Sequence, residues 1–180
     1  MDLPSNFKMM AAYNQRVNQQ LLDVCASLSS QKLLQEHGSF FPSIMAHWNH
    51  ILFGDLIMLQ RLVENGLVTI DAKLLASLPR STRVNDTFVS SYEELVELRN
   101  KVDNIYLDIT AMWTVDDMWK AVQYTTTEGQ KIERTLGEFV QHIFNHQTHH
   151  RGQMTCLLSQ LNLDYGCMDL PVVVPEGMNL

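Results

Sequence analysis

The chain has 180 residues, 46% of them hydrophobic, and its 13 basic and 20 acidic residues give a net charge of -7. This length and composition predict one globular domain over residues 1–180, and an acidic chain without runs of Lys or Arg is not expected to bind nucleic acid. No run of about 18 apolar residues and no leader pattern is present, so we expect a cytoplasmic protein that does not enter membranes. Cys25, Cys156 and Cys167 lack C-x-x-C spacing and predict neither a disulfide framework nor a cysteine metal site. Cys25 and Cys156 are expected to pack as small apolar residues.

The first half of the chain carries two patterns typical of amphipathic helices. Apolar residues recur at steps of three and four over residues 6 to 28, which predicts the first helix. A polar stretch with Gly38 follows. A second pattern over residues 41 to 65 ends at Asn65-Gly66, a pair typical of a left-handed helix stop, and predicts the second helix.

The segment over residues 66–90 is expected to be a long crossover connection. It is rich in polar turn residues and offers at most one short helical turn, around residues 71–78. Ser91 followed by Glu94 then forms a capping-box signature, and the third helix is predicted over residues 91 to 112.

Two short segments before the last helix predict a β-hairpin. Residues 119–127 and 130–135 are rich in Val, Tyr and Thr and flank Glu128-Gly129. A second capping box opens a fourth helix over residues 136 to 161, and the last twenty residues predict an ordered or partly ordered tail. The expected fold is all-α: a four-helix bundle with a long crossover between helices 2 and 3, rather than simple up-down-up-down order, and a short β-hairpin before helix 4.

Histidines are concentrated in the predicted fourth helix. Four of the seven histidines, His142, His146, His149 and His150, fall within nine residues. Residues four apart on a helix lie about 40° apart around the axis, so the imidazoles of such a pair can meet at one ion. The apolar stripe of the helix places His146 and His150 toward the interior, and His142 and His149 toward solvent. A metal or ordinary hydrogen bonds would satisfy the two interior rings, so the spacing alone leaves both explanations open.

A third ligand has to come from another helix, since one helix face does not enclose a tetrahedral ion. His47 and His50 lie one turn apart in the second helix, and periodicity mildly favours His47, which is nearer the centre of the apolar stripe. No Glu stands three residues before a His, and the H-E-x-x-H, nucleophile-elbow, phosphate-loop and dinucleotide-binding signatures are missing. A mononuclear site built from histidines alone is the remaining reading of a polar bundle interior.

Three segments resemble the DinB-like family of metal-dependent helical-bundle proteins, and the resemblance covers nearly the whole chain. The strongest match runs from Asn145 to Gln153 and is similar to the family's H-x-x-x-H-R-G-Q signature, whose ligands fall on His146 and His150. The other two matches are Ala12-Tyr13-Asn14 through Asn18 to Leu21, and Asn49-His50-Ile51-Leu52 followed by Asp55.

The resemblance implies one divalent metal ion held by His50, His146 and His150. In the family's second-helix motif the histidine after asparagine is the ligand, so the resemblance selects His50 over His47. It also implies a crossover order of helices and a homodimer formed through helix faces. Met58 stands where relatives commonly carry an aromatic residue, which leaves the wall of the pocket undefined.

Three neutral imidazoles leave the charge of a divalent ion intact and at least one coordination position open, as in catalytic zinc sites. Zinc or nickel fits such ligands first, and iron or another divalent metal is compatible. No organic cofactor and no catalytic side chain is assigned.

The resemblance favours an enzyme that uses the metal to activate a small-molecule thiol for transfer to an electrophilic substrate. One alternative is a hydrolase that uses metal-bound hydroxide, with Gln153 or Asp55 orienting the water, although either residue fits equally well as an inert structural partner. The other is a non-catalytic, metal-stabilised stress-response or binding module, so whether the protein is an enzyme is open at this stage. Arg151 suits either an anionic cosubstrate or a surface ion pair, and neither Arg151 nor His149 is assigned a catalytic role.

Overall fold

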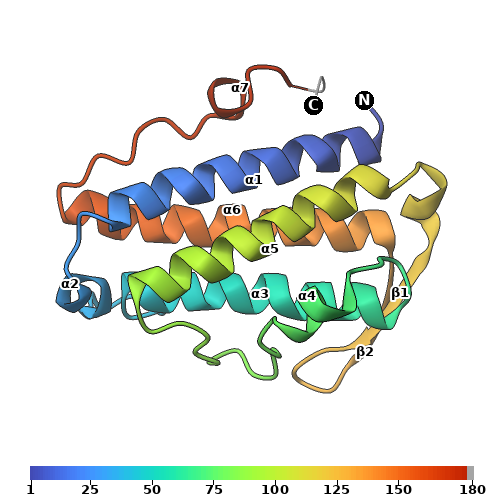
Figure 1. Cartoon of the computed structure of the whole chain (residues 1–180), viewed down its shortest axis with the longest axis horizontal. Coiled ribbons are helices and arrows are strands. Elements are labelled where there is room, and N and C mark those ends of the chain that lie inside the picture. The colour runs from blue at the N-terminus through green and yellow to red at the C-terminus, as the bar shows by residue number, and fades with distance from the viewer. Residues whose placement is uncertain (178–180) are drawn as a thin grey trace.

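Four long helices dominate the computed structural model, which describes residues 1–177 (Figure 1). They are α1 (Leu3–Cys25), α3 (Ile44–Glu64), α5 (Tyr92–Met112) and α6 (Leu136–Gln160). The shorter elements are α2 (Ser30–Leu34), α4 (Ala72–Ala76), the 3₁₀ helix η1 (Asp116–Trp119), the strands β1 (Ala121–Thr125) and β2 (Lys131–Thr135), and α7 (Leu170–Val173). The predicted helical bundle with a hairpin before its last long helix is confirmed.

Side chains that cap free backbone N–H groups set where the long helices begin. Ser91 and Thr135 each form a capping box with a glutamate three residues on, as the sequence predicted. α1 begins at Leu3 rather than at residue 6, because Asp2 caps it and Pro4 is tolerated in a first turn. Local hydrogen bonding therefore accounts for the confirmed starts of α5 and α6 and for the earlier start of α1. Two other boundaries also differ by three residues, because α1 ends at Cys25 rather than at residue 28, and α3, capped by Ser43, begins at Ile44 rather than at residue 41.

The long connection from α3 to α5 decides the order of the bundle. In Figure 1, α3 and α5 run in the same direction, and α1 and α6 run in the opposite one. α1 packs against α5 and α6, and α3 packs against α6 and α5. A tight turn does not join two parallel helices, so residues 65–91 return along the bundle and carry α4 on the way. The expected crossover is confirmed, and the short turn predicted at residues 71–78 is α4.

A buried network of polar side chains ties the four long helices together. Asp55 on α3 forms an ion pair with Arg99 on α5 and accepts hydrogen bonds of 3.0 Å from Gln147 Nε2 on α6. Arg99 also pairs with Asp103 at 2.9 Å, and Asn18 on α1 donates to Asp103 at 3.0 Å. These side chains are at most 3% exposed, and unpaired polar groups there would be costly. The network thus fixes how α3 and α6 face each other.

The hairpin packs at the C-terminal end of α3. β1 and β2 pair in antiparallel register over residues 121–125 and 131–135. The side chain of Asn65 accepts from Gln123 N at 2.9 Å and donates to Gln123 O at 3.0 Å. The end of α3 therefore holds the hairpin in place.

The segment after α6 folds back along α1. The Tyr13 hydroxyl donates to Met168 O at 2.8 Å, and Arg16 Nη1 donates to Val173 O at 2.9 Å. The predicted tail is thus ordered as far as the structure describes it, and its residues 178–180 lie outside the described part.

Two expectations drawn from composition are tested by the fold. Cys25 is buried as predicted, but Cys156 is exposed because it lies on the outer face of α6, so the prediction that it packs inside is wrong. Over residues 1–177, the structure contains no helix with the length and hydrophobicity needed to span a membrane.

Candidate metal centre

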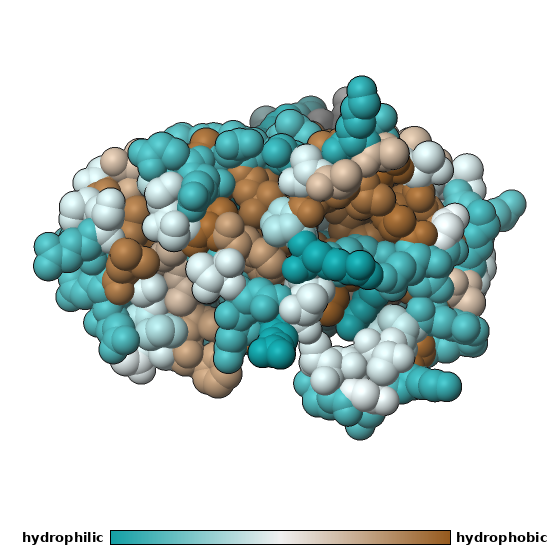
Figure 2. All heavy atoms as spheres, turned by 60° about the horizontal axis from the view of Figure 1, so that its bottom comes forward, coloured by the Kyte–Doolittle hydropathy of each residue, from teal (hydrophilic) through white to brown (hydrophobic). Residues whose placement is uncertain are grey.

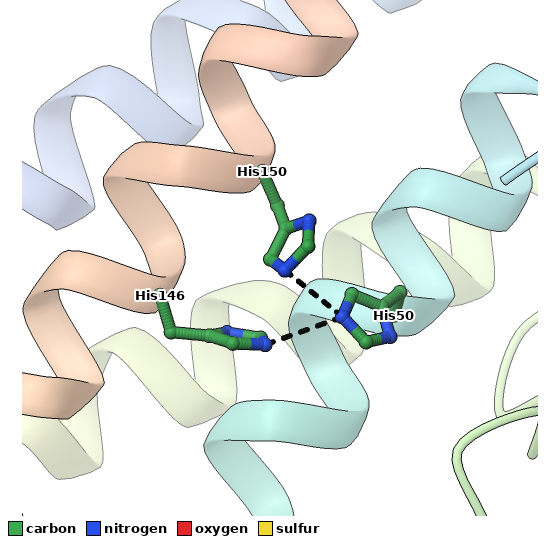
Figure 3. A group of neighbouring side chains, drawn as sticks. All are labelled: His50, His146 and His150. Atoms are coloured by element: carbon green, nitrogen blue, oxygen red, sulfur yellow. Dashed lines mark hydrogen bonds between the residues drawn. The ribbon is translucent and has the colours of Figure 1, made fainter. Parts of the chain in front are cut away.

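Three imidazole nitrogens meet between α3 and α6 (Figure 3). His50 Nε2 lies 3.0 Å from His150 Nε2 and 3.2 Å from His146 Nε2, and the three rings offer ligand atoms that all lie within 4.8 Å of one another. In a tetrahedral site with metal–nitrogen bonds of about 2.0 to 2.1 Å, the ligand nitrogens are about 3.3 Å apart. The observed spacing therefore suits a single small ion.

Hydrogen bonding alone does not satisfy this arrangement. A ring nitrogen has one position in the plane of the ring, and that position carries either a proton or a lone pair. His50 Nε2 can therefore form a well-aligned hydrogen bond with only one of its two neighbouring nitrogens. Its contact with the other, whether that is His146 or His150, is left without a good hydrogen bond. A cation accepts all three lone pairs at once, so these donors fit a metal better than a hydrogen-bonded cluster.

Gly54 creates the space that His146 occupies. A Cβ atom at position 54 would lie 2.3 Å from His146 Cε1 and 2.6 Å from His146 Nδ1, far inside van der Waals contact. Only glycine lets α3 and α6 approach with this ring between them. The ring of Phe41 stacks on the His50 imidazole with centroids 3.9 Å apart, which restrains the plane of that ring.

Burial keeps the three imidazoles neutral. It lowers the pKa of His146 to about 3 and the pKa of His50 to about 4, and charge on His150 would oppose protonation of both. The pKa of His150 is lowered as well, again mainly by burial. Neutral rings offer free lone pairs at physiological pH, as metal ligation requires.

Gln153 sets the tautomer of His150. Its Oε1 lies 2.8 Å from His150 Nδ1, and an amide oxygen only accepts, so Nδ1 carries the proton and Nε2 keeps a lone pair. Histidines that bind metals commonly donate their other N–H in this way. Gln153 therefore supports a ring of the cluster rather than standing free to orient a water.

His47, which periodicity mildly favoured, lies outside the cluster. It is 1% exposed, and its Nδ1 lies 3.0 Å from Ser43 O one turn back. As α3 packs in the bundle, it is the side chain of His50, three residues after His47, that faces α6. His50, and not His47, is therefore the ring that meets His146 and His150.

Two other residues considered for the site belong to the buried network instead. Asp55 is 1% exposed and is engaged by Arg99 and Gln147. Arg151 is also 1% exposed, and it donates to Gln147 Oε1 and to Asn14 Oδ1, both at 2.7 Å. Burial lowers the pKa of Arg151 to about 10. Both roles considered for Arg151, a surface ion pair and an anionic cosubstrate partner, are wrong because it lies on the inner face of α6.

Sequence reasoning missed Gly54 and Phe41. A glycine inside a helix costs about 1 kcal/mol relative to alanine, so its presence in the middle of α3 was an available sign of close backbone approach. Phe41 comes from the loop before α3, where no periodic pattern assigns a face. His142 and His149 are exposed on α6, as predicted.

Two pockets adjoin the histidine cluster. One, of about 210 Å³, lies between α3, the hairpin and α6 and has His146 in its wall. The other, of about 370 Å³, lies between the loop before α3 and the crossover and has His50 and Phe41 in its wall. A third pocket, of about 330 Å³ and mostly apolar, lies between α3 and α4 and contains none of the three histidines. The first two pockets therefore border the cluster, one beside His146 and the other beside His50.

Comparison with known proteins assigns the chain to a family. Residues 3–173 match the DinB family. The chain is 28% identical over 159 residues to Protein DinB of Bacillus subtilis (strain 168), a match that covers 86% of this chain and 88% of that protein. A solved DinB-like protein from Bacillus cereus ATCC 10987 has the same fold, with a TM-score of 0.56 and 22% identity over 86% of this chain and 90% of that one. The chain therefore belongs to the DinB family.

Proposed function

We propose that this protein binds one divalent metal ion through His50, His146 and His150. The observation that carries the proposal is the convergence of three neutral ring nitrogens at 3.0 and 3.2 Å, which hydrogen bonds alone leave unsatisfied. Membership of the DinB family supports it. Imidazole ligands suit zinc or nickel first, and iron is also compatible.

We further propose that the protein is an enzyme that transfers a small-molecule thiol to an electrophile. A divalent ion with three neutral ligands keeps its full charge and would lower the pKa of a thiol that binds beside it. In the transfer, the thiol sulfur forms a bond to an electrophilic carbon, the leaving group departs with its electron pair, and the thiol proton passes to solvent.

The chain's own residues would orient the reactants. Gln153 hydrogen-bonds to His150, and the Phe41 ring stacks on His50. These contacts would hold the Nε2 lone pairs of both rings toward the position of the metal ion, beside which the reactants bind. His146 lines one of the adjoining pockets and His50 lines the other. Two pockets suit a reaction between two molecules, which approach the cluster separately.

Hydrolysis receives less support from the same geometry. The two residues expected to orient a water, Asp55 and Gln153, are engaged by Gln147 and His150. A hydrolase also needs only one organic substrate, and so only one of the two pockets. The non-catalytic module remains the alternative that experiment has to separate from the enzyme.

Metal content is the first test. Elemental analysis of the purified protein should find about one equivalent of metal per chain, and His50→Ala should have lost it. His142→Ala removes an exposed histidine from α6 and should keep the metal. Wild-type metal content in His50→Ala would refute the proposed ligand set.

Thiol chemistry is tested on the cobalt(II) form. Glutathione, bacillithiol or mycothiol should produce a sulfur-to-cobalt absorption band and, with 1-chloro-2,4-dinitrobenzene, a conjugate whose formation depends on the metal. Metal binding without a response to any of the three thiols would refute thiol transfer. In that case ester hydrolysis would indicate the hydrolase, and its absence the non-catalytic module.

A homodimer formed through helix faces stays a prediction that rests on the family resemblance. Light scattering of the purified protein would test it, and a mass of about twice the 20.7 kDa of the chain would support it. The cytoplasmic location likewise stays a prediction from composition.

A further inference from the structure

Arg61 is a half-buried cation with no carboxylate at close range. None of the ion pairs formed within residues 1–177 includes it. Its guanidinium lies 4.1 Å from the centroid of the Tyr124 ring, and Nη2 donates to Thr125 O at 3.2 Å. Burial lowers the pKa of Arg61, and the charges of Tyr124, Glu64 and Glu128 offset this only in part. A cation held in this way is ready to pair with an anion from outside the chain.

Arg61 lines the same pocket as His146. The pocket of about 210 Å³ between α3, the hairpin and α6 has both residues in its wall, together with Thr126 and Thr127 of the hairpin turn. On the face shown in Figure 2, the hairpin forms a projection at the lower right whose residues are coloured white to teal, which means neutral to hydrophilic. A ligand in this pocket would have the histidine cluster at one end and the guanidinium at the other.

Helix geometry gives the separation of these two ends. Gly54, against which His146 packs, and Arg61 are seven residues apart on α3, so they lie on one face of the helix about 10 Å apart along its axis. The Arg61 side chain turns back toward the cluster, because its Nη1 contacts Met58 Sδ at 3.4 Å, three residues earlier. The gap from the guanidinium to the cluster is therefore on the order of 6 to 10 Å.

We propose that this pocket binds a small molecule through a carboxylate that pairs with Arg61. In the thiol reaction this molecule is the thiol substrate, and its sulfur lies beside His146. A guanidinium has five N–H donors in a planar fork, and the recorded contacts to Thr125 O and Met58 Sδ leave others free to hold a carboxylate. Arg61 is then a residue that determines substrate specificity. The sulfur end of this inference rests on the proposed function, whereas the carboxylate end requires no metal.

The experiment compares two thiols of equal length. 6-Mercaptohexanoate spans the gap and carries a carboxylate, and 6-mercapto-1-hexanol is its neutral counterpart. Titrated into the cobalt(II) form, the acid should bind at least about tenfold more tightly than the alcohol, because a hydrogen bond between charged groups in a half-buried site is worth about that much. Hexanoate titrated into the metal-free protein and followed by NMR tests the carboxylate end by itself.

Arg61→Met should abolish the preference for the acid and leave the affinity for the alcohol unchanged, and Arg61→Lys should retain part of the preference. Arg134→Met removes the same charge from an exposed position on β2 and should behave as wild type. Because Asn65 also anchors the hairpin, we expect the Arg61 variants to fold, and unchanged alcohol binding would verify this.

Equal affinity of the wild type for acid and alcohol would overturn the proposal. Equal weakening of both probes in Arg61→Met would also overturn it, because Arg61 would then only hold the hairpin. If neither thiol changes the cobalt spectrum, the sulfur end of the proposal is overturned, and the proposed thiol function fails as well if glutathione, bacillithiol and mycothiol also give no response. In that case hexanoate binding that is lost in Arg61→Met would still support the anion site, and no hexanoate binding would refute it.

Discussion

Replacement of Gly54 by alanine tests the geometry of the metal centre with a single methyl group. The added Cβ would lie 2.3 Å from His146 Cε1, whereas ordinary contact begins at 3.4 Å, so the ring has to move by about 1 Å. Metal–nitrogen bonds tolerate deviations of only about 0.2 Å. His146 therefore cannot remain a ligand while α3 and α6 keep their packing.

The expected effect on metal affinity is large and the expected effect on folding is small. Loss of one of three protein ligands should weaken metal binding at least about a hundredfold, or about 2.7 kcal/mol. Alanine is more favourable than glycine inside a helix by about 1 kcal/mol, which offsets the cost of moving a half-buried ring outward. The metal-free variant should thus unfold at nearly the wild-type temperature.

Chelator competition measures the affinity, and thermal unfolding with and without zinc measures the stability. The matched control is Gly152→Ala on α6, where an added Cβ meets nothing within 4 Å. Wild-type metal affinity in Gly54→Ala would refute the inferred position of the ion. An equal loss in the control would show that helix propensity, and not displacement of His146, is responsible.

Further predictions concern the buried network, the support of the cluster and the acid range. Asp55→Ala should lower the free energy of unfolding by about 3 kcal/mol in urea titrations, because it removes one of the buried partners of Arg99, and a change under about 1 kcal/mol would contradict this. Gln153→Leu should weaken metal affinity about 10- to 100-fold in chelator competition without changing the stability of the metal-free protein. Asp117→Asn should lower the melting temperature at neutral pH, since the hydrogen bond from Lys120 lowers the pKa of Asp117 from 3.8 to about 2. Because the folded-state pKa of Asp117 lies below its unfolded value, the stability that its carboxylate contributes is present above about pH 4 and is lost as the pH falls through about 2. If the melting temperature of Asp117→Asn is still below that of the wild type at about pH 2, the carboxylate charge is not the cause.

Spacing along the chain determined the secondary structure and two of the three rings of the histidine cluster. Helical periodicity and the capping boxes at Ser91 and Thr135 set the long helices within a few residues, because these signals act inside one turn. The four-residue step from His146 to His150 put both rings on one face of one helix. These features depend only on residues close together in the sequence, so they can be predicted without knowing how the helices pack against one another.

Tertiary structure alone decided which faces meet. Local periodicity mildly favoured His47, and only the family resemblance selected His50. It is the rotation of α3 against α6 that brings His50 to the other two rings. The same packing gives Gly54 its role and takes Arg151 into the buried network, although the sequence allowed Arg151 a surface position. The angle between two helices and their rotation about their own axes arise from contacts across the whole core. The apolar pattern of a single helix therefore does not determine them.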